Sequence, residues 1–111
     1  MPKRDADILI EDIETAVARI ERYVAGLDRQ GFLQDEKTID AVVRNLEIIG
    51  EAVRWLPGEF KERHTEVPWS QIAGLRNRIV HDYFGLDLEI IWRVLETSLP
   101  EFKQHLANLR R

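Results

Sequence analysis

Apolar residues recur at spacings of three and four along most of this 111-residue chain. Between residues 7 and 27 they form a single series: Leu9, Ile13, Val17, Ile20, Val24 and Leu27. That spacing places them on one face of an α-helix, whereas a half-buried strand would alternate with a period of two. No segment shows sustained alternation, so the sequence predicts an all-α fold.

Interruptions of this periodicity predict an up-and-down bundle of four to five helices in a single domain over residues 1–111. After the helix at 7–27, residues 28–34 are predicted to be a connection, because Gly26 and Gly31 punctuate them. A second helix should begin at Asp35 or Thr38, either of which can cap it, and end near residue 56 before Pro57. Residues 57–68 are then a loop with room for one helical turn.

A third helix is predicted over 69–83, and Asp87 can cap a fourth. Pro100 either kinks that fourth helix or opens a short fifth one. Gly50 costs about 1 kcal/mol inside a helix. We therefore expect it to mark the close approach of a neighbouring helix.

Composition excludes several classes of site. The chain has no cysteine and three histidines with no His-x3-His pair, which excludes disulfides, thiolate zinc sites, cysteine nucleophiles and zincin-type sites. We expect no metal or other cofactor. No apolar run approaches the ~20 residues of a membrane span, and the first residues lack the apolar core of a signal peptide. The expectation is a cytoplasmic protein without a membrane partner.

The formal net charge is -4, from 20 acidic and 16 basic residues. It argues against a protein that coats nucleic acid by bulk electrostatics, because phosphate binding needs neutralising lysines and arginines. A compact local phosphate site remains compatible with that charge.

One polar set stands out between residues 75 and 84: Arg76, Asn77, His81 and Tyr83. On a helix, Asn77 and His81 form an i,i+4 pair, and all four side chains fit an arc of about 160°. An arginine can hold a phosphate and a histidine can move a proton near neutral pH, so the set suits phosphodiester cleavage without a metal. Asn77 could fix the histidine tautomer. A twofold homodimer would supply the second histidine that paired acid and base roles require. On spacing alone, a polar interface or a satisfied buried network explains the set better than catalysis does.

The ordered motifs resemble the HEPN superfamily. Arg76-Asn77 followed by His81-Asp82-Tyr83 is similar to its Arg-x4-6-His signature, in the Arg-x4-His-x-Tyr form of HepT-like toxins. Further elements of that family resemble Ile48-Ile49-Gly50-Glu51-Ala52, Val67-Pro68-Trp69 leading into Gly74-Leu75-Arg76-Asn77, and Ile90-Ile91-Trp92. The resemblance covers nearly the whole chain.

The resemblance implies a metal-independent ribonuclease toxin that dimerises along its motif helices. Arg76 would bind the scissile phosphate, His81 would be the general acid/base, and Asn77 would orient them. A minimal nucleotidyltransferase antitoxin, MntA, would silence the toxin by transferring AMP to Tyr83, in an assembly that could be larger than the dimer. The expected RNA product ends in a 2',3'-cyclic phosphate. Two alternatives stay open: a non-catalytic HEPN module that docks a nucleotidyltransferase and presents substrate or nucleotide to it, and a purely structural dimerisation bundle.

Other residues carry weaker predictions. Arg78 is expected in a surface or interface ion pair or on RNA, and Asp82 in solvent. Glu51 either pairs with a motif arginine or is an exposed helix carboxylate. We expect the tryptophans to be core or interface anchors; they are Trp55, Trp69 and Trp92. The two remaining histidines, His64 and His105, are expected to be exposed. The basic residues near the C-terminus are expected to form a frayed tail; they are Lys103, Arg110 and Arg111.

Overall fold

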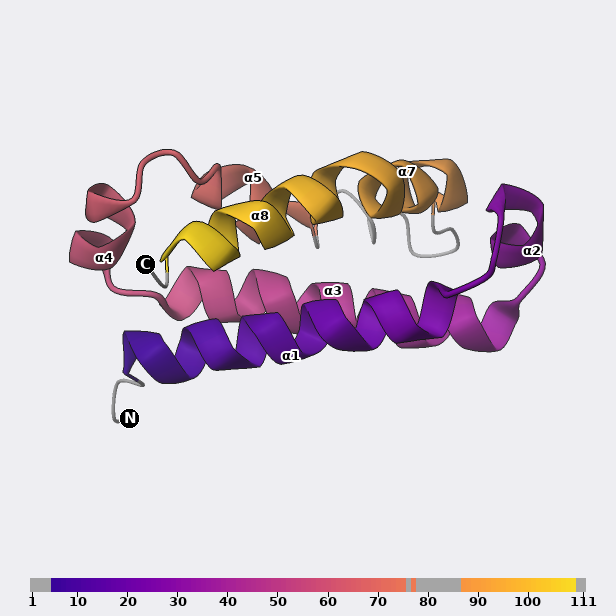
Figure 1. Cartoon of the computed structure of the whole chain (residues 1–111), viewed down its shortest axis with the longest axis horizontal. Helices are drawn as coiled ribbons and strands as arrows, with labels where there is room; N and C mark the ends of the chain where they lie inside the picture. The colour runs from indigo at the N-terminus through magenta and orange to yellow at the C-terminus, as the bar shows by residue number, and fades with distance from the viewer. Residues whose placement is uncertain (1–4, 76, 78–86, 110–111) are drawn as a thin grey trace.

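The computed structural model describes residues 5–75, 77 and 87–109, and every regular element among them is helical. The two long helices, α1 (Ala6–Val24) and α3 (Glu36–Trp55), lie side by side and antiparallel as one layer (Figure 1). α7 (Leu88–Arg93), the π-helix η1 (Val94–Ser98) and α8 (Leu99–Leu109) form one continuous rod across them. The all-α prediction is confirmed. Among the described helices, none is long and apolar enough to cross a membrane.

Three short helices complete the described structure (Figure 1). α2 (Arg29–Leu33) and α4 (Gly58–Arg63) lie at opposite ends of the long layer, and α5 (Trp69–Ala73) lies beside the rod. The core lies between the two layers, and its most deeply buried side chains are aliphatic or aromatic: Ile13, Ile20, Phe32, Val42, Leu46, Ile49, Val53 and Ile91. Burying each such side chain contributes about 1.5–3 kcal/mol, so these contacts dominate the stability of the bundle.

α1 matches its prediction at the start and ends earlier than predicted. Asp5 caps it by accepting a hydrogen bond from the backbone N–H of Asp7 at 3.2 Å. The helix ends at Val24 because Gly26 adopts a φ of 80°, a left-handed conformation that glycine tolerates and a continuing helix cannot use. The predicted residues 25–27 are therefore a turn.

Both predicted caps of α3 take part in one capping interaction. The Asp35 carboxylate accepts from the Thr38 backbone N–H at 3.1 Å and from the Thr38 hydroxyl at 2.8 Å. These two hydrogen bonds hold the pKa of Asp35 below its ordinary value, because they stabilise the ionised carboxylate. The helix ends at Trp55, where Leu56 turns extended before Pro57.

The prediction that residues 28–34 form only a connection is wrong, because they contain α2. Asp28 caps this helix by accepting from the Gly31 backbone N–H at 2.8 Å. Phe32 is fully buried, with its ring 5.5 Å from that of Trp92 on α7. Arg29 also pairs with Glu89 on α7. Tertiary burial thus stabilises a helix that five residues could not sustain alone.

The rod passes Pro100 without a break, through the π-helix. The Leu99 backbone N–H reaches the Val94 carbonyl, an i→i+5 bond, in place of the usual i→i+4. Pro100, which has no N–H to donate, then falls in the first turn of α8. Of the two predicted alternatives, the one in which Pro100 opens a further helix is the closer.

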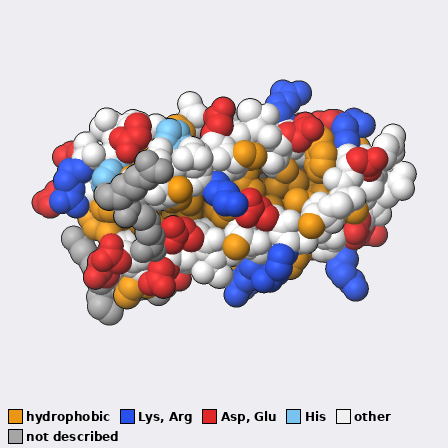
Figure 2. Space-filling view, viewed as in Figure 1, with side chains coloured by type: hydrophobic (Ala, Val, Ile, Leu, Met, Phe, Trp, Pro, Cys, Tyr) orange, Lys and Arg blue, Asp and Glu red, His pale blue; other side chains and the backbone are white. Residues whose placement is uncertain are grey.

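Lys103 is not part of a frayed tail. It lies inside α8 and donates to both carboxylate oxygens of Glu21 on α1, at 3.0 and 3.2 Å. Figure 2 shows the molecule from the same side as Figure 1; hydrophobic side chains reach this surface between the two layers, and charged groups lie beside them. The ion pair bridges α1 and α8, while Arg110 and Arg111 lie outside the described residues.

Candidate functional site

α5 delivers the chain to the predicted catalytic motif. Its end is Ala73, Gly74 follows as a turn, and Leu75 and Asn77 are helical again. The predicted helix over 69–83 is therefore interrupted at Gly74. Leu75 is 7% exposed and belongs to the core, so the residue immediately before Arg76 is firmly anchored.

Packing on three sides fixes α5. Trp69 is buried, donates its indole N–H to the His64 carbonyl at 2.9 Å and lies edge-on to the ring of Phe102 on α8. On the other side, α5 meets α3 at Gly50, where an added Cβ would lie 3.5 Å from the Ala73 carbonyl oxygen and 3.6 Å from that of Ile72. The close helix approach predicted at Gly50 is confirmed. These contacts hold α5, the element just before the motif, against α3 and α8.

Asn77 is the only predicted catalytic residue among those the structure describes, and its side chain is exposed on a helical backbone. An exposed amide is available to a ligand or a second protein chain, and it is not part of a network buried within its own chain. Arg76, Arg78, His81, Asp82 and Tyr83 lie outside the described residues. Their predicted roles stay predictions.

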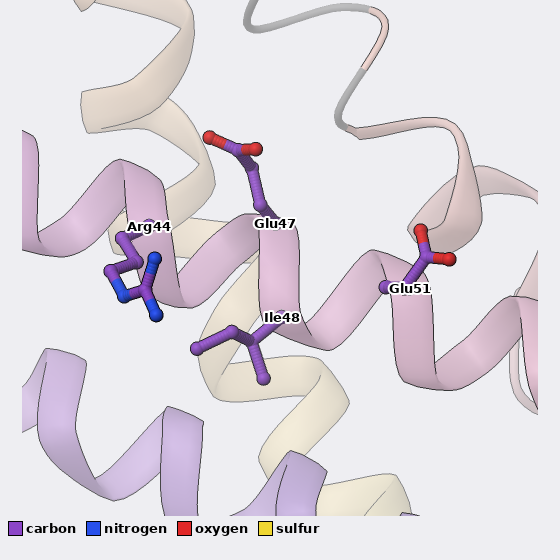
Figure 3. A pocket seen from close by; sticks show the side chains of 4 residues that line it. All are labelled: Arg44, Glu47, Ile48 and Glu51. Carbon is purple, nitrogen blue, oxygen red and sulfur yellow. The ribbon is translucent and has the colours of Figure 1, made fainter.

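A hollow of about 290 Å³ lies on α3, lined by Arg44, Glu47, Ile48 and Glu51. Figure 3 shows that Glu47 and Glu51 point toward one edge of the helix, while Arg44 and Ile48 point toward the other. Arg44 is exposed, and Ile48 is partly buried against the core. The sequence prediction named Ile48 and Glu51 but did not predict a hollow with charged and apolar lining at this place.

The Glu51 carboxylate lies at the surface, with partners on the same helix. It accepts from the Trp55 indole N–H at 3.0 Å and lies 3.7 Å from the Arg54 guanidinium. Its side chain is half-exposed. The other predicted role, pairing with a motif arginine, involves Arg76 or Arg78 and so falls outside the described residues.

The prediction for the tryptophans is confirmed as core anchors for two of them and not for the third. Trp69 is buried and Trp92 is partly buried against Phe32, so both are core anchors. Trp55 is 60% exposed, which contradicts a core role and leaves the interface role open. The exposed positions predicted for His64 and His105 are wrong: both are partly buried, with the His64 ring 4.7 Å from that of Phe60.

A smaller hollow of about 80 Å³ lies between α5 and the rod, next to Leu75. Its floor is apolar, and its rim carries Gln71, Ser98, Glu101 and His105. Within residues 5–75, 77 and 87–109, no three histidine or carboxylate side chains come close enough to hold a metal ion together.

Comparisons with known proteins agree on a single family. The family model described as "Ribonuclease HepT-like" matches residues 13–109. A protein of Thermococcus cleftensis named "Probable ribonuclease HepT" is 38% identical over 98% of this chain and 99% of its own. A protein of Caldanaerobacter subterraneus, named as a candidate RNase, is 36% identical over 97% of this chain and 93% of its own. A third relative, also named as a candidate RNase, comes from Methanocaldococcus jannaschii and is 40% identical over 90% of this chain and 83% of its own. No solved structure gives a significant match.

Proposed function

The chain belongs to the HepT-like ribonuclease family, and from this premise we propose that it is a metal-independent endoribonuclease, the toxin of a toxin–antitoxin pair. The observation that carries the proposal is the position of the motif. The anchored α5 and the buried Leu75 lead directly into Arg76 and the exposed, helical Asn77. A rigid element that leads into an exposed polar residue is what a site for a charged substrate needs.

In the proposed reaction, the ribose 2'-oxygen attacks the neighbouring phosphorus and the bond to the 5'-oxygen of the next nucleotide breaks. One proton leaves the 2'-hydroxyl and one is delivered to the departing 5'-oxygen, so the products are a 2',3'-cyclic phosphate and a 5'-hydroxyl. His81 is the proton-transferring group, and Arg76 stabilises the charge that develops on the phosphate. Asn77 orients the histidine or the phosphate. A homodimer brings two such sets to one composite cleft, which supplies both an acid and a base.

The proposed control acts on Tyr83. A MntA-like nucleotidyltransferase antitoxin would transfer AMP from ATP to Tyr83: the tyrosine oxygen bonds to the α-phosphorus, the hydroxyl loses its proton and pyrophosphate leaves. On a helix, residues 76 and 83 would fall on one strip, which would bring the added phosphate next to Arg76. The added phosphate would occupy the guanidinium and exclude the RNA phosphate.

The decisive experiment incubates the purified protein with total RNA in EDTA. We expect the wild type to cleave and His81→Ala and Arg76→Ala to be slower by about 10²-fold or more. His64→Ala is the matched control, because it removes a histidine between α4 and α5, outside the motif, and it should cleave as the wild type does. Cleavage by His81→Ala at the wild-type rate would contradict the assignment. A wild type that never cleaves would favour the docking module instead.

The proposed regulation by AMP can be tested with the two tyrosines of the chain, Tyr23 and Tyr83, of which Tyr23 serves as the comparison. Incubation with the antitoxin and ATP should add adenylyl groups to the wild type and to Tyr23→Phe, as measured by intact mass. Tyr83→Phe should gain none and should remain active after the same treatment. Adenylylation of Tyr83→Phe would refute Tyr83 as the target.

A further inference from the structure

The hollow of about 80 Å³ between α5 and the rod has Leu75 in its floor, and we call it the α5–α8 hollow. Two other buried side chains, Ile72 and Phe102, belong to the same apolar floor. Pockets that enclose a drug-sized molecule have roughly 300–1,000 Å³, so this hollow accepts one edge of a flat ring rather than a whole nucleoside. Because Arg76 follows Leu75 in the chain, the hollow begins one residue before the group proposed to bind the scissile phosphate.

Four polar side chains form the rim of the α5–α8 hollow: Gln71 on α5, Ser98 at the end of η1, and Glu101 and His105 on α8. Glu101 is exposed, and within the part of the chain that the structure describes its carboxylate makes no ion pair or hydrogen bond. The amide of Gln71 and the hydroxyl of Ser98 can each donate and accept. An apolar floor with a few polar groups at its rim is the arrangement of a small-ligand site, in which the polar groups determine orientation and specificity.

The irregular turn of the rod lies in the wall of the α5–α8 hollow. Ser98 is the last residue of the π-helix η1, and Glu101 follows it in the first turn of α8. A π turn contains one residue more than an α-helical turn, and such turns occur frequently at functional sites. The π-helix is thus a second observation, independent of the polar rim, that favours a binding role for this hollow.

The charge of the hollow determines which part of an RNA chain fits it. Its lining residues include no lysine or arginine, and Glu101 is an anion, so the hollow does not suit a phosphate. A carboxylate instead accepts hydrogen bonds from N–H groups on the edge of a base, which single-stranded RNA leaves free.

Guanine is the base that matches a carboxylate best. Its Watson–Crick edge carries two neighbouring donors, the N1–H and the 2-amino group, which can bind the two oxygens of one carboxylate. Adenine and cytosine present an amino group beside an acceptor nitrogen, and the N–H of uracil lies between two acceptor oxygens. An acceptor on the base would face the negative charge of the carboxylate and weaken binding.

We propose that the α5–α8 hollow binds an unpaired guanine of the RNA substrate, next to the bond that is cleaved. The carboxylate of Glu101 accepts from the N1–H and the 2-amino group, Gln71 and Ser98 pair with the remaining polar atoms of the base, and the ring lies against the apolar floor. The inference rests on the proposed ribonuclease function and gives that function a sequence preference.

Binding of short uridine oligonucleotides with one varied central residue tests the proposal. The oligonucleotides carry 2'-O-methyl groups, so they lack the attacking hydroxyl and stay intact, and fluorescence anisotropy measures their Kd with the wild-type protein. We expect a central guanine to bind on the order of tenfold more tightly than adenine, cytosine or uracil. A central inosine, which lacks only the 2-amino group, should bind with intermediate affinity. Equal binding of all bases, no measurable binding, or a preference for another base would overturn the proposal.

Variants on the rod assign the preference to the hollow. Glu101→Gln keeps the size of the side chain and replaces one acceptor oxygen by a donor, so it should lose most of the preference for guanine. Ser98→Tyr places a large side chain into the hollow and should reduce the affinity for the guanine oligonucleotide to that for uridine alone. Glu96→Gln is the matched control, because it neutralises an exposed carboxylate of the same rod outside the hollow, and it should bind as the wild type does.

Circular dichroism verifies that these variants keep their helical content. A preference for guanine that persists in folded Glu101→Gln and Ser98→Tyr would place guanine binding elsewhere and overturn the hollow as its site.

Mapping of the cleavage positions in unmodified RNA separates this inference from the function on which it rests. Wild-type cleavage that is lost in His81→Ala but shows no preference for guanine would leave the ribonuclease standing and overturn the guanine site. A preference for guanine in binding, lost in Glu101→Gln, from a wild type that cleaves no RNA would leave the site standing as an RNA-binding hollow and overturn the ribonuclease.

Discussion

Asn45 on α3 is the only buried polar side chain among the described residues, at 4% exposed. Its amide nitrogen donates to the Ala41 carbonyl at 2.8 Å, and its amide oxygen has no hydrogen-bond partner. A buried acceptor without a partner costs about 1–3 kcal/mol. The buried side chains around it in the described core are apolar, so the unsatisfied oxygen lowers the stability of the α1–α3 layer.

We therefore expect Asn45→Leu to raise the free energy of unfolding by about 1 kcal/mol. The leucine side chain branches at the same atom as asparagine, and it removes the unsatisfied oxygen without emptying the site. Asn45→Ala should give a smaller gain or a loss, because it leaves a cavity. Urea unfolding of the two variants and the wild type measures the difference, and a less stable Asn45→Leu would contradict the prediction.

The cap of α3 gives a prediction about pH. Hydrogen bonds from Thr38 lower the pKa of Asp35 in the folded protein, so the folded state favours the ionised carboxylate more than the unfolded state does. This contribution is present above the pKa of the unfolded chain. The contribution to stability is lost as the pH falls through the lower pKa of the folded state, so the loss occurs below about pH 4.

Asp35→Asn should remove this dependence while keeping an oxygen that can cap the helix. Thermal unfolding of both proteins between pH 3 and pH 7 is the measurement. We expect the gap in Tm between wild type and Asp35→Asn to narrow as the solution becomes more acidic. A gap that is constant across this range would show that the Asp35 charge contributes nothing.

At the scale of elements, the contact between α3 and α5 determines where the motif begins. Gly50 allows the Ala73 and Ile72 carbonyls to approach α3, yet a Cβ would sit there at ordinary van der Waals distance. Glycine inside a helix costs about 0.5–1 kcal/mol relative to alanine. Gly50→Ala should therefore be as stable as the wild type or more stable by that amount, and it should retain ribonuclease activity.

Gly50→Leu has no such room, because the atoms beyond its Cβ would press on the α5 backbone. We expect it to destabilise the fold by about 1–3 kcal/mol and to reduce RNA cleavage more than its stability loss explains, since α5 leads into Arg76. Denaturant unfolding paired with the RNA assay measures both. Full activity in Gly50→Leu would contradict the role of α5 in positioning the motif.

Periodicity predicted the long helices because their burial is spread over many turns of one face. It missed α2, whose formation depends on Phe32 and its partner Trp92, sixty residues away in the chain. It also overlooked the ion pair that Lys103 makes with Glu21, because pairing across layers leaves no local signal. The predicted helix at 69–83 is broken at Gly74 because packing against α3 and α8, rather than local spacing, sets the end of α5.

At the scale of the whole molecule, a dimer makes thermal stability depend on protein concentration. Association stabilises only the folded state, so Tm should rise as the wild-type protein is concentrated. Calorimetry over a hundredfold concentration range measures it, and a wild-type Tm that does not move would argue against a folded-state dimer.

The sequence identified the candidate motif more readily than its surroundings. Arg76, Asn77, His81 and Tyr83 are recognisable by residue type and order, which do not depend on the fold. The outer face of α3 is different, because charged and apolar residues on the outer face of a helix look the same whether water or a second chain covers them.

The π-helix at Val94–Ser98 has a consequence for chain length. A π turn accommodates one residue more than an α-helical turn while the helix on either side keeps its direction. The rod therefore contains a surplus residue, and Ile91 and Phe102 face the core on opposite sides of it. A deletion of one residue here would straighten the turn into ordinary α-helix and leave both faces in phase. The same deletion in α1 would rotate half of its buried residues into solvent by about 100°. The middle of the rod is thus the place where this bundle can shorten by one residue without repacking.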